Sequence, residues 1–361
     1  MDGAAHWLAT LGAGGAGAWL AARFYLMPSP RVFQPSTPAP WPPCQPPTRA
    51  PGGGGVGGDD GSEVLRCVQI NVWSGSTYEL EPAGASTLYH LLWGRFGSFE
   101  PEGQAAERYR ALVSELRRLR PSIVCVNEAD SEAWVRKLAE DLGLAAIWHP
   151  GVAVVRLGPV VLPPGIEEGD AILFHPQLQC EHAARRALSG SVWGSRLAAN
   201  FGDATQALSV RLRTPAGRRL FVLGTHWRAT LIEDEVGSQE AEALASTYGG
   251  KDGERVRTAG ERLLREGSEM RLEESAGVVA ELRSRAAADA DGVIVLGDLN
   301  TTRGTPEVRR LLEEGQLRDA WAGSEADGAT WSPSNPHVAH QIHVAVRTLP
   351  YHILRHLRGC S

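Results

Sequence analysis

The chain has 361 residues, 43% of them hydrophobic, which is enough for one large domain or two ordinary ones and excludes a peptide hormone, a coiled coil or a disulfide mini-protein. The formal net charge is −6, so a polyanion such as a nucleic acid would have to bind a local basic patch and not the surface as a whole. The five cysteines lie far apart and include no Cys-x-x-Cys pair, so they predict neither a disulfide framework nor a structural zinc site.

The first 62 residues differ in composition from the rest of the chain. Residues 7–27 form an apolar, glycine-rich stretch, interrupted at Arg23, that is short for a membrane span and lacks the basic start of a secretory signal. We expect residues 1–27 to be an organelle or secretory targeting peptide, or an anchor that associates with a membrane; a disordered or mis-assigned start is the alternative. Residues 28–62 contain ten prolines and seven glycines, which predicts a disordered linker that builds no core.

Residues 63–361 alternate short apolar strands with amphipathic helices, which predicts a single mixed α/β domain. Segments rich in Val, Ile or Leu predict strands over 64–72, 123–127, 171–174, 206–212, 220–225 and 293–296. Helices are predicted over 104–120, from a Ser131 cap to Gly143, over 254–288, and after Thr305 and Pro306.

Four polar signatures follow predicted strands. They read Gln69-Ile70-Asn71-Val72-Trp73, Pro121-Ser122-Ile123-Val124-Cys125-Val126-Asn127-Glu128, Leu223-Gly224-Thr225-His226 and Val295-Leu296-Gly297-Asp298-Leu299-Asn300. Each is weak alone, but in this order they resemble the endonuclease/exonuclease/phosphatase superfamily of metal-dependent phosphoesterases, over residues 64–332. The resemblance implies an α/β fold, a four-layer sandwich of two mixed β-sheets flanked by helices, with the active site where strand ends of both sheets converge.

Glu128 and Asn71 are the candidate metal ligands. Glu128 follows the apolar run 123–126, so its carboxylate is expected at the end of a buried strand, where an unpaired charge is costly. A salt bridge to an arginine would satisfy it, whereas the resemblance implies a divalent cation, Mg²⁺ with Mn²⁺ as an alternative, supported by Asn71. Without the other motifs, Asn71 would be interpreted as a strand-end asparagine bonded to its own backbone.

The resemblance also implies three catalytic residues. Asp298 orients or deprotonates the attacking water, Asn300 holds a phosphate oxygen, and His226 donates a hydrogen bond to the scissile phosphate. Because Asp298 and Asn300 alternate along an extended segment, their side chains are expected on the same side. For Asp298 and Asn300 the competing interpretation is a Gly-Asp turn before the next helix. For His226 it is a histidine with a structural role only.

The end of the chain departs from the family pattern, which finishes with an Arg-Ile-Asp-Tyr strand and a later Ser-Asp-His. Here the run-up Thr330–Pro336 leads to His340-Gln341-Ile342-His343-Val344, so His343 stands in the place of the aspartate, and no Asp-His dipeptide follows residue 332. A truncated or frame-shifted gene model, a natural pseudoenzyme, and a substitute histidine nearby would each explain this. Five of the eleven histidines follow residue 336, which indicates an atypical end and favours the first explanation.

The sequence therefore predicts a metal-dependent phosphoester hydrolase, and specifically a phosphodiesterase. A lipid, a nucleotide and an inositol phosphate all remain candidate substrates, whereas the acidic domain disfavours double-stranded DNA. The alternative is a catalytically silent domain that binds a phosphorylated ligand or a protein partner. The sequence indicates no oligomeric state.

Overall fold

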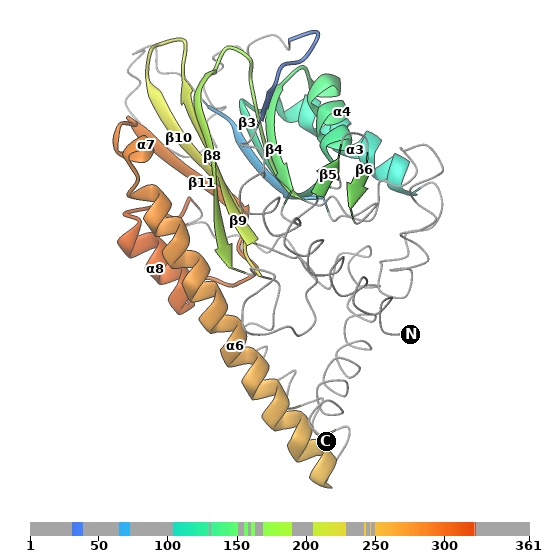
Figure 1. Ribbon diagram of the computed structural model, residues 1–361, viewed down its shortest axis with the longest axis vertical. Helices are drawn as coiled ribbons and strands as arrows, with labels where there is room; N and C mark the ends of the chain where they lie inside the picture. Colours follow the sequence, from blue (N-terminus) through green and yellow to red (C-terminus); the bar gives the residue numbers. More distant parts are fainter. Residues whose placement is uncertain are drawn as a thin grey trace, which may run out of the picture. The chain divides into compact units, whose positions relative to one another are not determined.

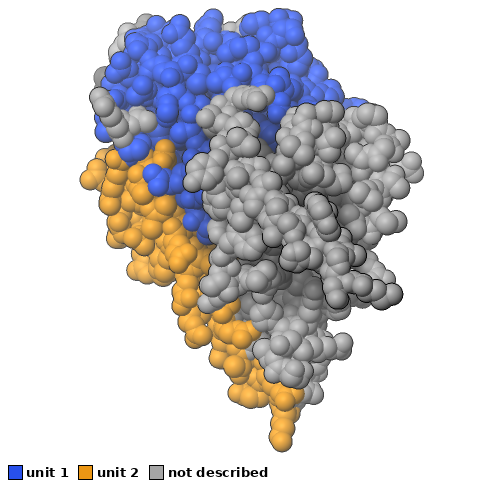
Figure 2. Space-filling model, in the orientation of Figure 1, with its two compact units in different colours: residues 1–226, 284–298 blue, residues 227–283, 299–361 orange. Residues whose placement is uncertain are grey.

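The computed structural model describes residues 31–38, 65–72, 104–129, 131–150, 155–157, 160–162, 169–189, 205–228, 242, 246, 250–320 and 322. The chain divides into two compact units (Figure 2). The domain bounds expected from the sequence, with one domain over residues 63–361, stay a prediction. Unit 1 comprises residues 1–226 and 284–298, and unit 2 comprises residues 227–283 and 299–361. Within the described ranges no helix is long and apolar enough to cross a membrane. The candidate targeting or anchor segment, residues 1–27, lies outside those ranges.

The first sheet of unit 1 has five strands in the order β1-β4-β7-β3-β2. Their bounds are β1 Arg31–Phe33, β2 Cys67–Asn71, β3 Ile123–Ala129, β4 Ala145–Pro150 and β7 Gly169–Phe174. Only β2 and β3 run parallel, and the other neighbours are antiparallel. Strands β3 and β7 are buried along almost their whole length, which explains why both read as continuous apolar runs in the sequence.

The second sheet of unit 1 has four strands in the order β11-β10-β9-β8. Their bounds are β8 Gln179–Ser189, β9 Thr205–Arg213, β10 Arg219–His226 and β11 Gly292–Asp298. Here β10 and β11 are parallel and the remaining pairs antiparallel, so both sheets are mixed. A short hairpin, β5 Val155–Leu157 with β6 Val160–Leu162, stands apart from them.

The two sheets face each other (Figure 1). A continuous hydrophobic core lies between them. The first sheet contributes Ile123, Ile147, Ile172 and Phe174, and the second contributes Leu208, Val210, Leu212 and Val222. Gly224 marks a close approach of the sheets, because a Cβ there would lie 2.9 Å from the sulfur of Cys125 and 3.2 Å from Cγ1 of Ile172. The predicted class, an α/β fold of two mixed sheets with flanking helices, is confirmed.

Two helices, α3 Gln104–Leu119 and α4 Glu132–Leu142, cover the outer face of the first sheet. Trp134 of α4 packs edge-on against Tyr109 of α3, with ring centres 5.9 Å apart. The Oγ of Ser131 accepts a hydrogen bond from the backbone N–H of Trp134, and Gly143 ends the helix at φ 66°. Both capping predictions are therefore confirmed.

Strand β1 lies inside the segment that the sequence predicted to be linker. Phe33 is 8% exposed and packs in the core, under the guanidinium of Arg136, which is 3.6 Å from the ring centre. The N–H of Ser36 then donates to Oε2 of Glu140 at 2.9 Å. A single aromatic side chain thus draws this proline-rich stretch onto the sheet edge, while the rest of residues 28–62 lies outside the described ranges.

Unit 2 contains the long helix α6 Gly250–Leu282 and the shorter α8 Pro306–Glu314. The sequence predicted one helix over 254–288, but α6 ends at Leu282, and residues Arg285–Ala288 form the separate helix α7, which belongs to unit 1. Thr305 occupies the N-cap position of α8 as expected, yet its hydroxyl donates to the carbonyl of Thr302 and makes no capping bond.

Candidate active site

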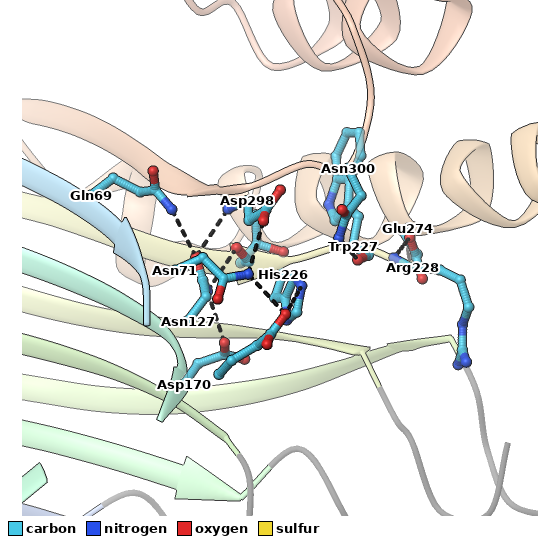
Figure 3. A network of polar contacts seen from close by, with 12 residues as sticks. Gln69, Asn71, Asn127, Asp170, His226, Trp227, Arg228, Glu274, Asp298 and Asn300 are labelled. Carbon is cyan, nitrogen blue, oxygen red and sulfur yellow. Dashed lines mark hydrogen bonds and ion pairs between the residues drawn. The ribbon is translucent and has the colours of Figure 1, made fainter. Parts of the chain in front are cut away.

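The candidate residues of unit 1 lie at the carboxyl ends of two parallel strand pairs, one in each sheet. Asn71 at the end of β2 is in register with Asn127 on β3, and His226 at the end of β10 is in register with Asp298 on β11. Parallel strands end at the same edge, so each pair places its terminal side chains together. Figure 3 shows Asn71, His226 and Asp298 gathered at this edge.

The backbone at Glu128 turns out of the strand. Between Val126 and Ala129 the register of β3 with β7 shifts, and Glu128 has φ 56°, in the left-handed region. A β-bulge of this kind re-aims a side chain, and holding a non-glycine residue there costs about 1–3 kcal/mol. The bulge leaves the Glu128 side chain 19% exposed, directly after a fully buried run.

One amide group joins the two carboxylates of the site. Nδ2 of Asn71 donates to Oε1 of Glu128 at 2.8 Å and to Oδ2 of Asp298 at 2.9 Å (Figure 3). Nε2 of His226 lies 3.7 Å from the same Oε1 of Glu128. The structure therefore brings together four of the five predicted site residues.

Gly297 explains how Asp298 reaches this position. A Cβ at Gly297 would lie 2.0 Å from the carbonyl oxygen of Thr225 on the neighbouring strand β10, so only glycine fits between the strands. The backbone N–H of Asp298 donates to Oδ1 of Asn127 at 2.9 Å. The Gly-Asp signature thus has a structural cause as well as a candidate chemical role.

A buried polar network, which was not predicted from the sequence, lies in the interior of unit 1 next to the site residues. Asn127, Asp170 and Gln206 are 0%, 4% and 0% exposed, respectively. Nδ2 of Asn127 donates to Oδ1 of Asp170 at 2.8 Å, and Nε2 of Gln206 donates to Oδ2 of the same carboxylate at 3.1 Å. The available signals were a polar residue directly before Glu128 and a single charge ahead of the apolar run 171–174.

Asn300 belongs to unit 2 and is described there. Its Nδ2 donates to the carbonyl oxygen of Trp227 at 2.8 Å, and its backbone has φ 46°. The expected alternation of Asp298 and Asn300 along one extended strand is not observed, because β11 ends at Asp298 and Asn300 follows in the left-handed region.

The donor set at the strand ends fits a hard divalent cation. Mg²⁺ prefers oxygen ligands and is commonly held by one or two carboxylates, with waters and substrate phosphates completing its shell. Glu128 supplies a carboxylate, and the amide of Asn71 carries an oxygen beside the nitrogen that now bridges Glu128 and Asp298. The carboxylate of Asp298 lies next to them, where it can hold a water. In the part of the chain that the structure describes, no three or more His, Cys, Asp or Glu side chains form a metal-binding group, so the protein alone offers a partial shell.

Several solved structures are distantly similar to this chain. One is the catalytic domain of human Nocturnin with bound sulfate, at 16% identity over 74% of this chain and 77% of that chain, with a TM-score of 0.46. Another is a β-hairpin deletion mutant of beta toxin from Staphylococcus aureus, at 19% identity over 77% and 81%, with a TM-score of 0.44. A third is ANGEL2, a 2′,3′-cyclic phosphatase, in complex with adenosine-2′,3′-vanadate, at 13% identity over 68% and 56%, with a TM-score of 0.41.

No curated protein matches the chain. A family model does match it over residues 68–343, which is more than half of its length. The chain belongs to the Endonuclease/Exonuclease/phosphatase family, whose members hydrolyse phosphoesters and generally use divalent metal ions.

Proposed function

We propose that this protein is a metal-dependent phosphodiesterase. The observation that carries the proposal is the shared amide of Asn71, which holds the carboxylates of Glu128 and Asp298 within hydrogen-bonding reach of one nitrogen atom. Like charges this close repel each other, and a cation bound at Glu128, beside Asp298, would offset that repulsion. Family membership supplies the reaction class, phosphoester hydrolysis.

Each strand end has one task in this proposal. Glu128, assisted by Asn71, holds Mg²⁺ or Mn²⁺, which when bound polarises the phosphate and neutralises developing charge. Asp298 orients the attacking water and accepts its proton. His226, whose Nε2 lies 3.7 Å from Glu128, donates a hydrogen bond to a phosphate oxygen. Asn300 holds a second phosphate oxygen, on the basis of its place two residues after Asp298 in the motif.

Hydrolysis of bis(4-nitrophenyl) phosphate tests this mechanism. Glu128→Ala is expected to lower kcat/KM by at least about 1,000-fold, as is chelation of the metal, because both remove charge stabilisation at the transition state. Glu115→Gln is the matched control, since Glu115 is an exposed carboxylate paired with Arg118 on α3. Activity that survives both chelation and Glu128→Ala would overturn the mechanism.

A catalytically silent domain that binds a phosphorylated ligand is the second candidate. It is favoured by one observation, the absence of an Asp-His dipeptide after residue 332. Wild-type protein without Mg²⁺-dependent turnover, but with Mg²⁺-dependent binding of a phosphorylated ligand, would support it. Sequencing the 3′ end of the transcript shows whether an Asp-His tail exists.

The substrate is best assigned by direct comparison. We propose a lipid, a nucleotide or an inositol phosphate in preference to double-stranded DNA, because the net charge is −6 and a nuclease needs a basic groove for the phosphate backbone. Turnover of the four substrates by the full chain should rank DNA last. A membrane role of residues 7–27 would appear as faster turnover of a lipid in vesicles than of the same lipid in micelles.

A further inference from the structure

We propose that Asn127 is a positioning residue, which sets the place of Asp298 and is itself oriented by the buried carboxylate of Asp170. The inference rests on the proposed function of Asp298. It concerns a set of buried groups that lie below the reacting side chains and join the two sheets of unit 1.

The hydrogen bonds around Asn127 fix the orientation of its amide group. Its Oδ1 accepts from the backbone N–H of Asp298 at 2.9 Å and from Nε2 of Gln69 at 3.1 Å. Its Nδ2 donates to Asp170 at 2.8 Å and to the carbonyl oxygen of Thr225 at 3.2 Å. A backbone N–H can only donate and a carbonyl can only accept, so the amide fits in one orientation alone.

These bonds link separate strands. Asn127 belongs to β3 of the first sheet, whereas Asp298 and Thr225 belong to β11 and β10 of the second. Their bonds therefore fix the separation and register of the two sheets at the point where Glu128 leaves one and Asp298 leaves the other. A displacement of about 1 Å between reacting groups can cost about 100-fold in rate.

Asp170 holds the Asn127 side chain from the buried side of the network. Its two carboxylate oxygens accept from Asn127 and Gln206, and Gln206 is held in turn by its bond to the carbonyl of His149 at 2.9 Å. Nε of Arg185 donates to Oε1 of Gln206 at 3.0 Å. Buried polar groups are costly unless satisfied, so this network favours one arrangement of the strands over its alternatives.

Asp170→Asn distinguishes positioning from general stabilisation. The variant leaves one oxygen to serve two donors, and we expect kcat to fall about 10-fold with KM little changed. The hydrogen exchange of the Asp298 amide should rise as well, because an Asn127 side chain that Asp170 no longer orients binds this N–H less firmly. A merely structural role predicts a lower free energy of unfolding with wild-type kcat and wild-type Asp298 exchange.

Asn127→Leu removes the acceptor for the Asp298 N–H. We expect kcat to fall about 100-fold and the hydrogen exchange of the Asp298 amide to rise at least about 10-fold, whatever the turnover. Ser122→Ala is the matched control, because Ser122 is also fully buried, precedes the same strand and accepts from the N–H of Arg66 at its far end. It should leave both readouts unchanged.

The outcomes separate the two proposals. Wild-type kcat or wild-type Asp298 exchange in Asn127→Leu overturns the positioning role, as does wild-type kcat in Asp170→Asn. If wild-type turnover survives chelation and Glu128→Ala, the proposed function fails instead. Amide exchange then still decides whether Asn127 holds Asp298.

Discussion

Two buried polar regions, one in each unit, hold candidate site residues by different means. In unit 1, the amides of Asn127 and Gln206 surround the single carboxylate of Asp170. In unit 2, the guanidinium of Arg271 pairs with the carboxylate of Glu307 at 2.9 Å, with the two side chains 0% and 1% exposed.

The ion pair of unit 2 fastens the loop that carries Asn300. Oγ1 of Thr301, the next residue, donates to Oε1 of Glu307 at 2.9 Å, and Oγ of Ser275 on α6 donates to the carbonyl of Glu307 at 2.8 Å. The opposite charges of an ion pair cancel, so the pair can hold a loop against a helix without adding net charge there. Amides orient a carboxylate and leave its charge in place, which suits residues next to Glu128 and Asp298.

Breaking the ion pair should have the largest effect. Arg271→Met leaves the Glu307 carboxylate buried without its cation and is expected to lower the free energy of unfolding by about 3–5 kcal/mol. Urea denaturation measures the loss, and faster hydrogen exchange of α6 amides should locate it in unit 2.

The double variant Arg271→Met/Glu307→Leu is the control. Replacing both partners of a buried pair by apolar groups is often nearly neutral, so most of the lost stability should return. A double variant as unstable as Arg271→Met would show that the loss does not come from the buried, unpaired carboxylate of Glu307.

Gly297→Ala tests unit 1, where the packing of the β11 backbone against β10, and not a charge pair, sets the position of Asp298. The added Cβ would meet the carbonyl oxygen of Thr225 at 2.0 Å, so β11 must move away from β10, at a cost of about 2–3 kcal/mol. Because Asp298 is the next residue, turnover should fall as well. Gly217→Ala isolates the cost of a positive φ, since Gly217 has φ 85° and an added Cβ there would meet no atom within 4 Å. It should cost about 1 kcal/mol without loss of activity.

The helix ends, the buried strands and most site residues could be predicted from the sequence, because each depends on residues that are close together along the chain. The Ser131 cap and the Gly143 stop are short-range signals, and the apolar runs around Ile123 and Phe221 identify buried strands. The site residues were found because their motifs follow those strands directly.

The remainder depends on contacts between distant residues. Asp170 meets Asn127 across 43 positions, and Asn127 meets Asp298 across 171, so no window of the sequence contains either pair. The bulge that puts Glu128 at φ 56° contradicts local preference and persists only because the folded structure holds it. Strand β8 was missed because its charged residues, such as Arg185 and Arg186, hide a strand pattern.

Asp141 lies between the two buried regions and a fully exposed charge in its degree of burial. Its carboxylate is at the surface of unit 1 and is 31% exposed. Partial burial raises its pKa, but hydrogen bonds from Lys137 and Tyr109 outweigh this and hold the pKa below its ordinary value of 3.8. Asp141→Asn should lower the free energy of unfolding at pH 7 by about 1 kcal/mol, less than a buried pair because water screens it.

The sign of the pH dependence follows from the lowered pKa. The stabilisation by Asp141 is fully present above pH 3.8 and is lost as the pH falls through the lower pKa of the folded state. Urea titrations at several pH values should therefore show the difference between wild type and Asp141→Asn shrinking only below about pH 4. A constant difference down to about pH 2 would mean that the charge of Asp141 contributes nothing.

The smallest effect is expected for Gln69→Leu, at the solvent side of the amide network. It removes one neutral donor to Oδ1 of Asn127 and leaves the N–H of Asp298 on the same oxygen. A neutral hydrogen bond at a half-buried position contributes about 0.5–1 kcal/mol, and turnover should change less than about 3-fold. If Gln69→Leu instead lowered kcat as much as Asn127→Leu, the Asp298 N–H could not by itself keep Asn127 in place, and the hydrogen bonds of the network would depend on one another.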